Sequence, residues 1–414
     1  MSALNTAFNS HQHVRIEPLV TGNFDMPIIN RAAELAEDAK VWRRDFHQHP
    51  ELLYEVHRTA ARVAELLTSF GVDEVVTGIG RTGVVGVIRG REPSSRVIGL
   101  RADMDALPLQ EIRDIPHKST IPGRMHACGH DGHTAMLLGA ARYLAETRNF
   151  AGTAVVIFQP AEEGGAGGRA MVDDGLMERF GIEEVYGLHN APGLPLGSVS
   201  TRVGAVMAAA DTFEVRLKGL GGHAARPNKC VDPIIAGAQI VTALQTIVAR
   251  NVDPVESAVL SITRFHAGTT ADNIIPQTAV IGGTVRTLDE EVRRLMDRRF
   301  KDLVTAMASG MGVEVEIDYE WGYPVVINHA EQTAFAAQVA RSVVGPDQVN
   351  TDMPPRLGGE DFAYMLQARP GAFVFMGIGD GAGVHHPEYD FNDDVIPHGI
   401  SYWAKLVETA MPAG

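Results

Sequence analysis

The sequence predicts an α/β protein, in which an open and mostly parallel sheet is interrupted by an inserted α+β layer. Three observations support this prediction. Short apolar segments are separated by helical patterns, and several of them end directly in acidic or histidine residues. The middle of the chain changes to a βαββαβ order. The 414 residues are enough for a large core and for more than one domain.

The main domain is expected to contain helices at 32–46 and 58–70. Its expected strands are short and apolar, at 83–89, 97–101, 153–158, 185–188 and 373–378. Sites in open parallel sheets lie outside the carboxyl ends of the strands. One edge of this sheet would therefore gather the acidic, thiol and imidazole groups that follow the strands, namely Asp103, Cys128, His130, Glu162, Glu163, His189 and His385.

The inserted layer begins at about residue 205. Residues 211–218 place Phe213, Val215 and Leu217 on one face, as an antiparallel strand does. Helices are expected at 234–250 and 290–307, and further strands at 259–263, 278–287 and 313–319. We therefore expect an N-terminal arm at 1–27, either flexible or packed, a main domain at 28–204 and 323–414, and an inserted domain at 205–322.

Composition excludes several classes of protein. The 36 lysines and arginines against 51 acidic residues give a net charge of −15, which argues against nonspecific nucleic-acid binding. We expect no transmembrane helix, because no apolar run reaches about 18 residues. The first residues lack the basic start and apolar core of a signal peptide. Two cysteines do not make a disulfide framework, so a reducing cytoplasm is the expected location.

Residues 125–134 contain the densest group of metal-binding side chains. His126, Cys128, His130, Asp131 and His133 lie around two glycines, just before a helical pattern. The amino end of a helix favours a thiolate over a thiol, which is the form of cysteine that binds metal. The segment therefore predicts a metal site. The alternative is a polar loop around a buried free cysteine.

The candidate ligands exceed the needs of one ion, which indicates a second ion nearby. Glu162 and Glu163 follow a strand and Pro160, so one could ligate metal while the other transfers a proton. His47 and His49 are expected to be structural. His223 could donate a hydrogen bond to an oxyanion, although such a residue taken alone is more often a surface histidine.

Several motifs together resemble the M20 metallopeptidases, and most closely their amidohydrolase branch of hippurate hydrolases, N-acyl-amino-acid hydrolases and plant auxin-conjugate hydrolases. The resemblance runs in order from about Trp42 to the C-terminus. The motifs are Asp103–Pro108, His126–His133, Pro160–Gly164, Leu188–Asn190, Gly222–Ala225, Asn273–Pro276, Gly359–Phe362 and His385–Pro387.

The resemblance implies a two-ion site, with Cys128, His130, Glu163, His189 and His385 as ligands. Asp103 is left out of this set, because other branches of the family have a metal-binding histidine at that place. The ions would be Mn or Zn, with Co or Ni also compatible. Glu162 would be the general base and acid, and Asp105 would orient a ligand.

The resemblance also implies roles for the inserted domain, which would be a lid that dimerises. His223 would stabilise the oxyanion in the neighbouring subunit's site, and Asn273 and Gly359 would hold substrate. We expect a homodimer or a higher oligomer that binds a small N-acyl-amino acid, with no nucleic-acid or membrane partner.

The predicted function is metal-dependent hydrolysis of the amide bond of N-acyl-L-amino acids. A dipeptidase or carboxypeptidase is the alternative within the family. A thiol amidase, with Cys128 as nucleophile and His130 as base, is a third possibility. A non-catalytic metal-binding protein is the fourth, and it would be expected to lack Glu162 or His223.

Overall fold

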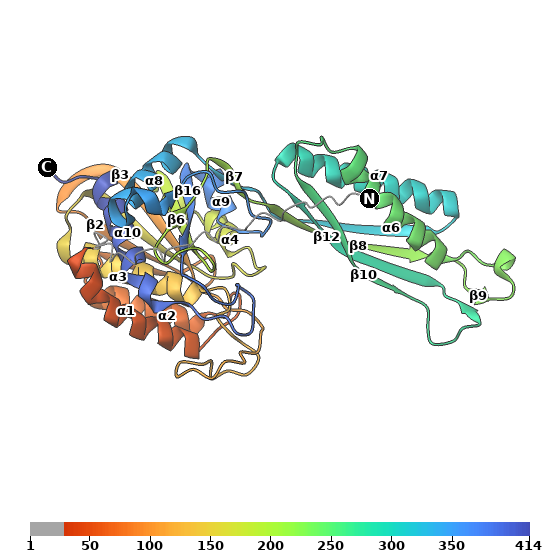
Figure 1. Cartoon of the computed structure of the whole chain (residues 1–414), viewed down its shortest axis with the longest axis horizontal. Helices are drawn as coiled ribbons and strands as arrows, with labels where there is room; N and C mark the ends of the chain where they lie inside the picture. Colours follow the sequence, from red (N-terminus) through yellow and green to blue (C-terminus); the bar gives the residue numbers. More distant parts are fainter. Residues whose placement is uncertain (1–28) are drawn as a thin grey trace, which may run out of the picture.

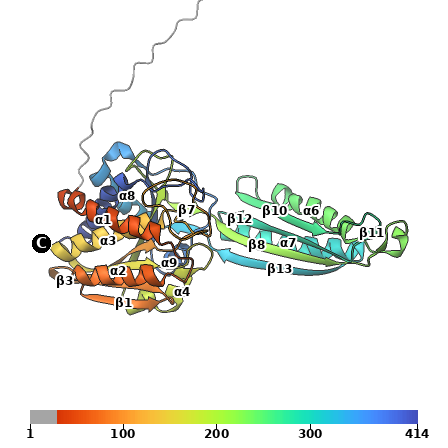
Figure 2. The same cartoon turned by 90° about the horizontal axis from the view of Figure 1, so that it is seen from below.

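The computed structural model describes residues 29–414, and it shows two lobes joined by a narrow connection (Figure 1, Figure 2). The predicted arm at 1–27 lies outside the described residues. The large lobe is built on an eight-stranded sheet of order β1-β2-β4-β3-β5-β16-β6-β15. Its strands are β1 (Glu74–Ile79), β2 (Gly83–Arg89), β3 (Glu92–Asp103), β4 (Ala151–Gln159), β5 (Glu184–Ala191), β6 (Val199–Ser200), β15 (Val349–Asn350) and β16 (Gly371–Gly377).

The centre of this sheet is parallel, as the sequence predicts. Strands β4, β3, β5 and β16 run in one direction and carry their carboxyl ends to one edge. Strands β1 and β2 are antiparallel additions. The central strands are apolar almost throughout because helices cover both faces of the sheet.

Alternate residues of each strand enter two different cores. Val84, Leu100 and Val156 pack in one core, and their neighbours Val85, Val155 and Ile157 in the other. The first face is covered by α1 (Asn30–Gln48), α2 (His57–Ser69), α3 (His130–Thr147), α8 (Ala330–Val344) and α10 (Ile396–Ala410). The second face is covered by α4 (Gly167–Asp173), α5 (Leu176–Arg179) and α9 (Ala363–Ala368).

The small lobe is a four-stranded antiparallel sheet of order β10-β12-β8-β13 with two helices on one face. Its elements are β8 (Ala209–Lys218), α6 (Pro233–Arg250), β10 (Ala258–Ala267), β12 (Thr278–Thr287), α7 (Glu290–Met311) and β13 (Glu314–Tyr323). Phe213, Val215 and Leu217 are buried under the helices, as the alternation predicts. Asp232 and Asp289 cap the amino ends of these helices, and their carboxylates accept backbone N–H groups of the first turn.

Of two short ribbons, one packs against the second core of the large lobe and the other lies in the small lobe. Strands β7 (Gly204–Met207) and β14 (Val326–Asn328) pair where the chain passes between the lobes. Strands β9 (Gly222–His223) and β11 (Ile274–Ile275) pair at the end farthest from the large lobe (Figure 1).

Helix α6 is, among the residues described, the one helix whose length and composition would allow it to cross a membrane. It packs on the small-lobe sheet through Ile240, Leu244 and Ile247, and most of its remaining surface is not buried.

The sequence prediction named no helix after residue 323, where the structure has α8 and α10, and it also differs from the structure at sheet edges. Strand β1 was not expected, because the polar and half-exposed segment Glu74–Ile79 lacks a continuous apolar run. Strand β10 continues to Ala267, beyond the expected end at 263, through residues that are exposed. In both segments backbone pairing defines the strand, while side-chain patterns report mainly burial.

Candidate metal centre

The carboxyl ends of the parallel strands form one edge of the large-lobe sheet, and the predicted ligands meet there. Strand β3 ends at Asp103, β4 ends just before Glu162 and Glu163, and β5 contains His189 near its end. Helix α3 begins at His130 beside the same edge. His385 comes from the loop after β16, where its N–H donates to the carbonyl of Ala127 (2.7 Å).

The turn before α3 depends on Gly129. Its φ angle of +91° is in the left-handed region that disfavours side chains. A Cβ atom there would lie 2.3 Å from Asn190 Nδ2 and 2.4 Å from the Tyr389 hydroxyl. Only glycine fits both constraints, and this tight turn brings Cys128 and His130 to the same cluster.

All five predicted ligands form one cluster. Cys128, His130 and His189 have donor atoms within 4.8 Å of one another, and so do Cys128, Glu163 and His385. Cys128 Sγ lies 3.3 Å from His189 Nε2, which is one contact of the first group. Glu163 Oε1 lies 3.4 Å from His385 Nε2 and 4.0 Å from His130 Nε2, so the two groups are contiguous.

The cluster fits divalent metal ions. His130 Nε2 and Glu163 Oε1 are buried, and neither has a hydrogen-bond partner among the described residues. Buried polar atoms without partners are costly, so they indicate a missing partner. Sulfur, imidazole nitrogen and carboxylate oxygen are the donors that zinc and similar ions prefer.

Surrounding groups aim the ligands at the cluster. His130 Nδ1 donates to the Asp105 carbonyl oxygen (2.9 Å), and His189 Nδ1 donates to the Asn190 carbonyl oxygen (2.7 Å). Both rings therefore turn Nε2 toward the cluster. The Asp105 carboxylate accepts the backbone N–H groups of Glu162 (2.9 Å) and Glu163 (3.1 Å), so it fixes the glutamate pair.

His133 and Asp131, from the 125–134 segment, form hydrogen bonds with residues outside the five predicted ligands, although His133 also lies near His130. His133 Nδ1 contacts Asp103 Oδ1 at 2.6 Å, and its Nε2 accepts the Asn190 N–H at 2.9 Å. Asp131 lies between Arg43 and His47. His47 is buried in that network and outside the cluster. His49 is half-buried, lies outside both, and bonds to the Asp45 carbonyl.

Glu162 lies in a strongly acidic environment. Burial raises its pKa well above the usual range, and the carboxylates of Glu360 and Glu163 raise it further. Arg101 is buried below it and pairs with Asp103 (2.8 Å), Glu360 (2.9 Å) and Asp361 (3.1 Å). One cation among so many carboxylates leaves excess negative charge, which favours both cation binding and a protonated Glu162.

The pKa of the Cys128 thiol is shifted in the direction opposite to the sequence prediction. We expected the amino end of the helix to favour a thiolate, but burial raises the pKa of Cys128 well above its ordinary value. Glu163 and Glu162 raise it further. Two nearby carboxylates outweigh the partial charge of the helix end, so a thiolate at this position needs bound cations.

A cavity of about 590 Å³ opens beside the cluster. Cys128, Glu162, Glu163, His189 and His385 lie on one side of it, and Gly359 also lines it. Two arginines that the sequence did not single out, Arg286 and Arg356, line the same cavity.

The two arginines have no carboxylate partner among the described residues. Arg286 bonds to the carbonyls of Leu357 (3.2 Å) and Val285 (3.1 Å). The Arg356 guanidinium lies 3.9 Å from the centre of the Phe375 ring. Arg356 is partly buried, and this burial lowers its pKa. The cavity therefore combines a metal-binding side with a cationic side.

His223 and Asn273 lie apart from the cluster. Both belong to the ribbon at the far end of the small lobe (Figure 1), where the Asn273 carbonyl accepts the Ala224 N–H at 2.9 Å. Both are exposed. Within one chain they do not reach the cavity, so their predicted roles require a second subunit and stay predictions.

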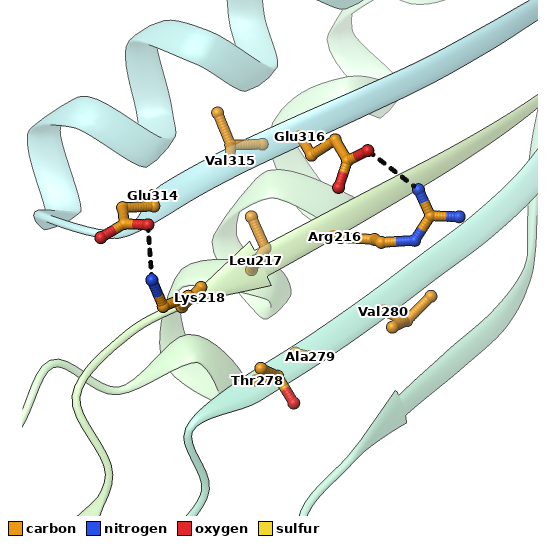
Figure 3. Close-up of a pocket in the computed structure, with 9 residues that line it drawn as sticks. All are labelled: Arg216, Leu217, Lys218, Thr278, Ala279, Val280, Glu314, Val315 and Glu316. Carbon is orange, nitrogen blue, oxygen red and sulfur yellow. Dashed lines mark hydrogen bonds and ion pairs between the residues drawn. The ribbon is translucent and has the colours of Figure 1, made fainter.

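Another cavity, of about 440 Å³, lies on the open face of the small-lobe sheet (Figure 3). Its charged residues pair with one another across strands, as Lys218 does with Glu314 (2.9 Å) and Arg216 with Glu316 (3.4 Å). It contains no histidine or cysteine, so we assign the chemistry to the cavity beside the cluster.

Comparisons with known proteins agree with this geometry. The family model described as peptidase family M20/M25/M40 matches residues 99–409. A hippurate hydrolase of Campylobacter jejuni is 42% identical over 384 residues, which are 92% of this chain and 98% of the relative. Thermostable carboxypeptidase 2 of Saccharolobus solfataricus is 40% identical over 395 residues, covering 92% and 98% of the two chains.

A solved structure is also similar. A dinuclear metal binding peptidase of the M20 family from Bacillus subtilis superimposes with a TM-score of 0.79 and 34% identity, covering 92% of this chain and 99% of the other. The chain therefore belongs to peptidase family M20/M25/M40, and it is a hydrolase of the amidohydrolase branch.

Proposed function

We propose that the protein hydrolyses the amide bond of N-acyl-L-amino acids and releases a carboxylic acid and a free amino acid. One observation carries this proposal: the cavity combines a metal-binding cluster and Glu162 with two arginines that lack carboxylate partners in the described chain. The amide would lie at the cluster. The α-carboxylate of the amino acid would pair with a guanidinium, which suits carboxylates through its planar set of donors.

Glu162 is proposed as the group that moves the proton. It is buried at the cavity wall, and its oxygen lies 4.0 Å from His130 Nε2. It accepts a proton from the attacking water and delivers it to the nitrogen of the departing amino acid. Bound cations would lower the raised pKa of Glu162, so that the group is a carboxylate when it accepts the proton.

Cys128, His130, Glu163, His189 and His385 are proposed to hold two divalent ions, with Mn or Zn preferred and Co or Ni compatible. When bound, such ions polarise a carbonyl and lower the pKa of water. The side chain of Asp105 keeps Glu162 and Glu163 in place during the reaction by holding their backbone N–H groups.

The inserted small lobe is proposed to join two subunits. His223 of one subunit would then donate a hydrogen bond to the oxyanion that forms in the other, and Asn273 would contact substrate there. This proposal explains why both residues lie exposed and far from the cluster of their own chain (Figure 1).

The proposal is tested with Glu162→Gln. The variant should keep the metal content of the wild type while kcat on N-benzoyl- and N-acetyl-amino acids falls by about 10³-fold, because proton transfer by a positioned side chain contributes on this scale. Metal is measured by elemental analysis of dialysed protein. The matched control is Glu388→Gln, which changes an exposed glutamate three residues from His385. Turnover in Glu162→Gln equal to that of the control would remove the base assignment.

A carboxypeptidase or dipeptidase is the second candidate, favoured by the similarity to the Saccharolobus carboxypeptidase. Its substrate also ends in a free α-carboxylate, so the arginines suit both candidates. A panel of N-acyl-amino acids and free dipeptides, assayed with each metal in turn, separates them through kcat/KM. Preference for dipeptides would favour the second candidate.

A further inference from the structure

Tyr323 lies where the small lobe returns to the large lobe. It is the last residue of β13 and pairs with Ala210, near the start of β8. Both strands that connect the lobes therefore meet at this residue. Its side chain does not continue into the small lobe, but lines the cavity beside the metal cluster.

The Tyr323 hydroxyl binds the loop that carries the glutamate pair. It donates to the carbonyl of Glu162, and it accepts the N–H groups of Gly164 (2.8 Å) and Ala166 (3.2 Å). One hydroxyl from the lobe junction therefore makes three hydrogen bonds to a single short segment.

This loop has an unfavourable backbone that needs external support. Ala161 and Ala166 both have a φ of +54°, and Gly164 has a φ of +97°. Alanine disfavours this region, so such a conformation persists only where surrounding contacts hold it. On one side the Asp105 carboxylate accepts the N–H groups of Glu162 and Glu163. On the other side the Tyr323 hydroxyl binds the Glu162 carbonyl and the N–H groups of Gly164 and Ala166.

We propose that Tyr323 is a positioning residue, which couples the orientation of the small lobe to the placement of Glu162 and Glu163. Any movement of the small lobe about its connection displaces the hydroxyl that fixes the loop. Glu162 and Glu163 are then correctly placed only when the small lobe has the orientation that allows all three hydrogen bonds.

Tyr323→Phe tests this, because it removes the hydroxyl and keeps the ring. We expect kcat to fall about ten-fold or more while KM changes less than about two-fold, since the loop is misplaced and the arginine side of the cavity is intact. We also expect the amide of Ala166, which donates to this hydroxyl, to exchange hydrogen about ten-fold faster in the metal-loaded protein. The Gly164 N–H also contacts the Glu162 carbonyl (2.7 Å), so its exchange should change less.

Tyr364→Phe is the matched control. The Tyr364 hydroxyl donates to the Gly322 carbonyl at 3.3 Å, and its ring packs edge-on against Tyr323. It therefore belongs to the same junction but does not touch the loop. Equal loss of kcat in both variants, or unchanged exchange of the Ala166 amide in Tyr323→Phe, would overturn the proposal.

The inference rests on the proposed role of Glu162, but the two fail separately. Full turnover in Glu162→Gln removes the base assignment and leaves the exchange result for Tyr323→Phe unaffected. Conversely, unchanged loop exchange in Tyr323→Phe removes the coupling while Glu162→Gln stays inactive.

Discussion

At this site the role of a side chain depends on its neighbours in the fold as well as on its residue type. Cys128 and His130 face the cluster, while His133, three residues later, bonds to Asp103 and Asn190. Arg356 shows the converse, because it belongs to no motif and gains its proposed role from the cavity alone. Residue type and spacing predicted that metal-binding side chains gather at this sheet edge, and the family resemblance implied which five of them are ligands. The sequence could not predict a role for Arg356, because that role depends on two tertiary features. The side chain packs on Phe375 of β16, and it lines the cavity.

Arg356→Met should weaken recognition of a free α-carboxylate. We expect kcat/KM on an N-acyl-amino acid to fall about 10–100-fold, because charge-assisted hydrogen bonds contribute about 1.5–3 kcal/mol. The corresponding N-acyl-amino acid amide, which has no negative charge, should lose far less. Arg341→Met, on an exposed part of α8, is the control. An equal loss on acid and amide would contradict the proposed contact.

At the scale of elements, the site depends on tight junctions between strands and helices. The amino end of α3 is completely buried, and Gly129 forms the turn that precedes it. Strands and helices with strong periodicity, such as α6 and β8, could be placed from the sequence within a residue or two. Edge strands such as β1 could not, because backbone pairing defines them and leaves little pattern in the side chains.

Gly129→Ala should destabilise the fold and remove metal together. The new Cβ meets Asn190 and Tyr389 in a left-handed backbone, which predicts a loss of about 2–4 kcal/mol in the free energy of unfolding. Denaturant unfolding measures this loss, and elemental analysis measures metal. The control is Gly310→Ala in α7, where a Cβ meets nothing within 4 Å. There we expect a gain of about 0.5–1 kcal/mol. If Gly129→Ala left the free energy of unfolding and the metal content unchanged, the turn would not need glycine.

For the whole molecule, we propose that two subunits associate through the exposed face of the small lobe. Helix α6 has no charged residue before Arg250, and its Ile235 side is exposed. Strand β10 beside it is an edge of its sheet. An uncharged helix face next to a free strand edge is a surface suited to a second copy of the chain. The order of secondary structure predicted the inserted sheet, but sequence patterns cannot reveal whether His223 reaches a neighbouring subunit.

Ile235→Glu should therefore separate the subunits. Sedimentation velocity should report a monomer, and kcat should fall about 100-fold or more, because removing an oxyanion donor has an effect of this size. Val41→Glu changes another exposed apolar residue, on α1 of the large lobe, and should alter neither property. A fully active monomer would show that His223 is not needed from a partner.

The central claim is that five side chains from separate segments hold two ions beside Glu162. The most direct measurement is anomalous diffraction from crystals of the protein reconstituted with Mn or Zn. We predict two peaks about 3.5–4 Å apart, enclosed by Cys128, His130, Glu163, His189 and His385. A metal-loaded, active crystal with no ion among these residues, or with its ions elsewhere, would contradict the account.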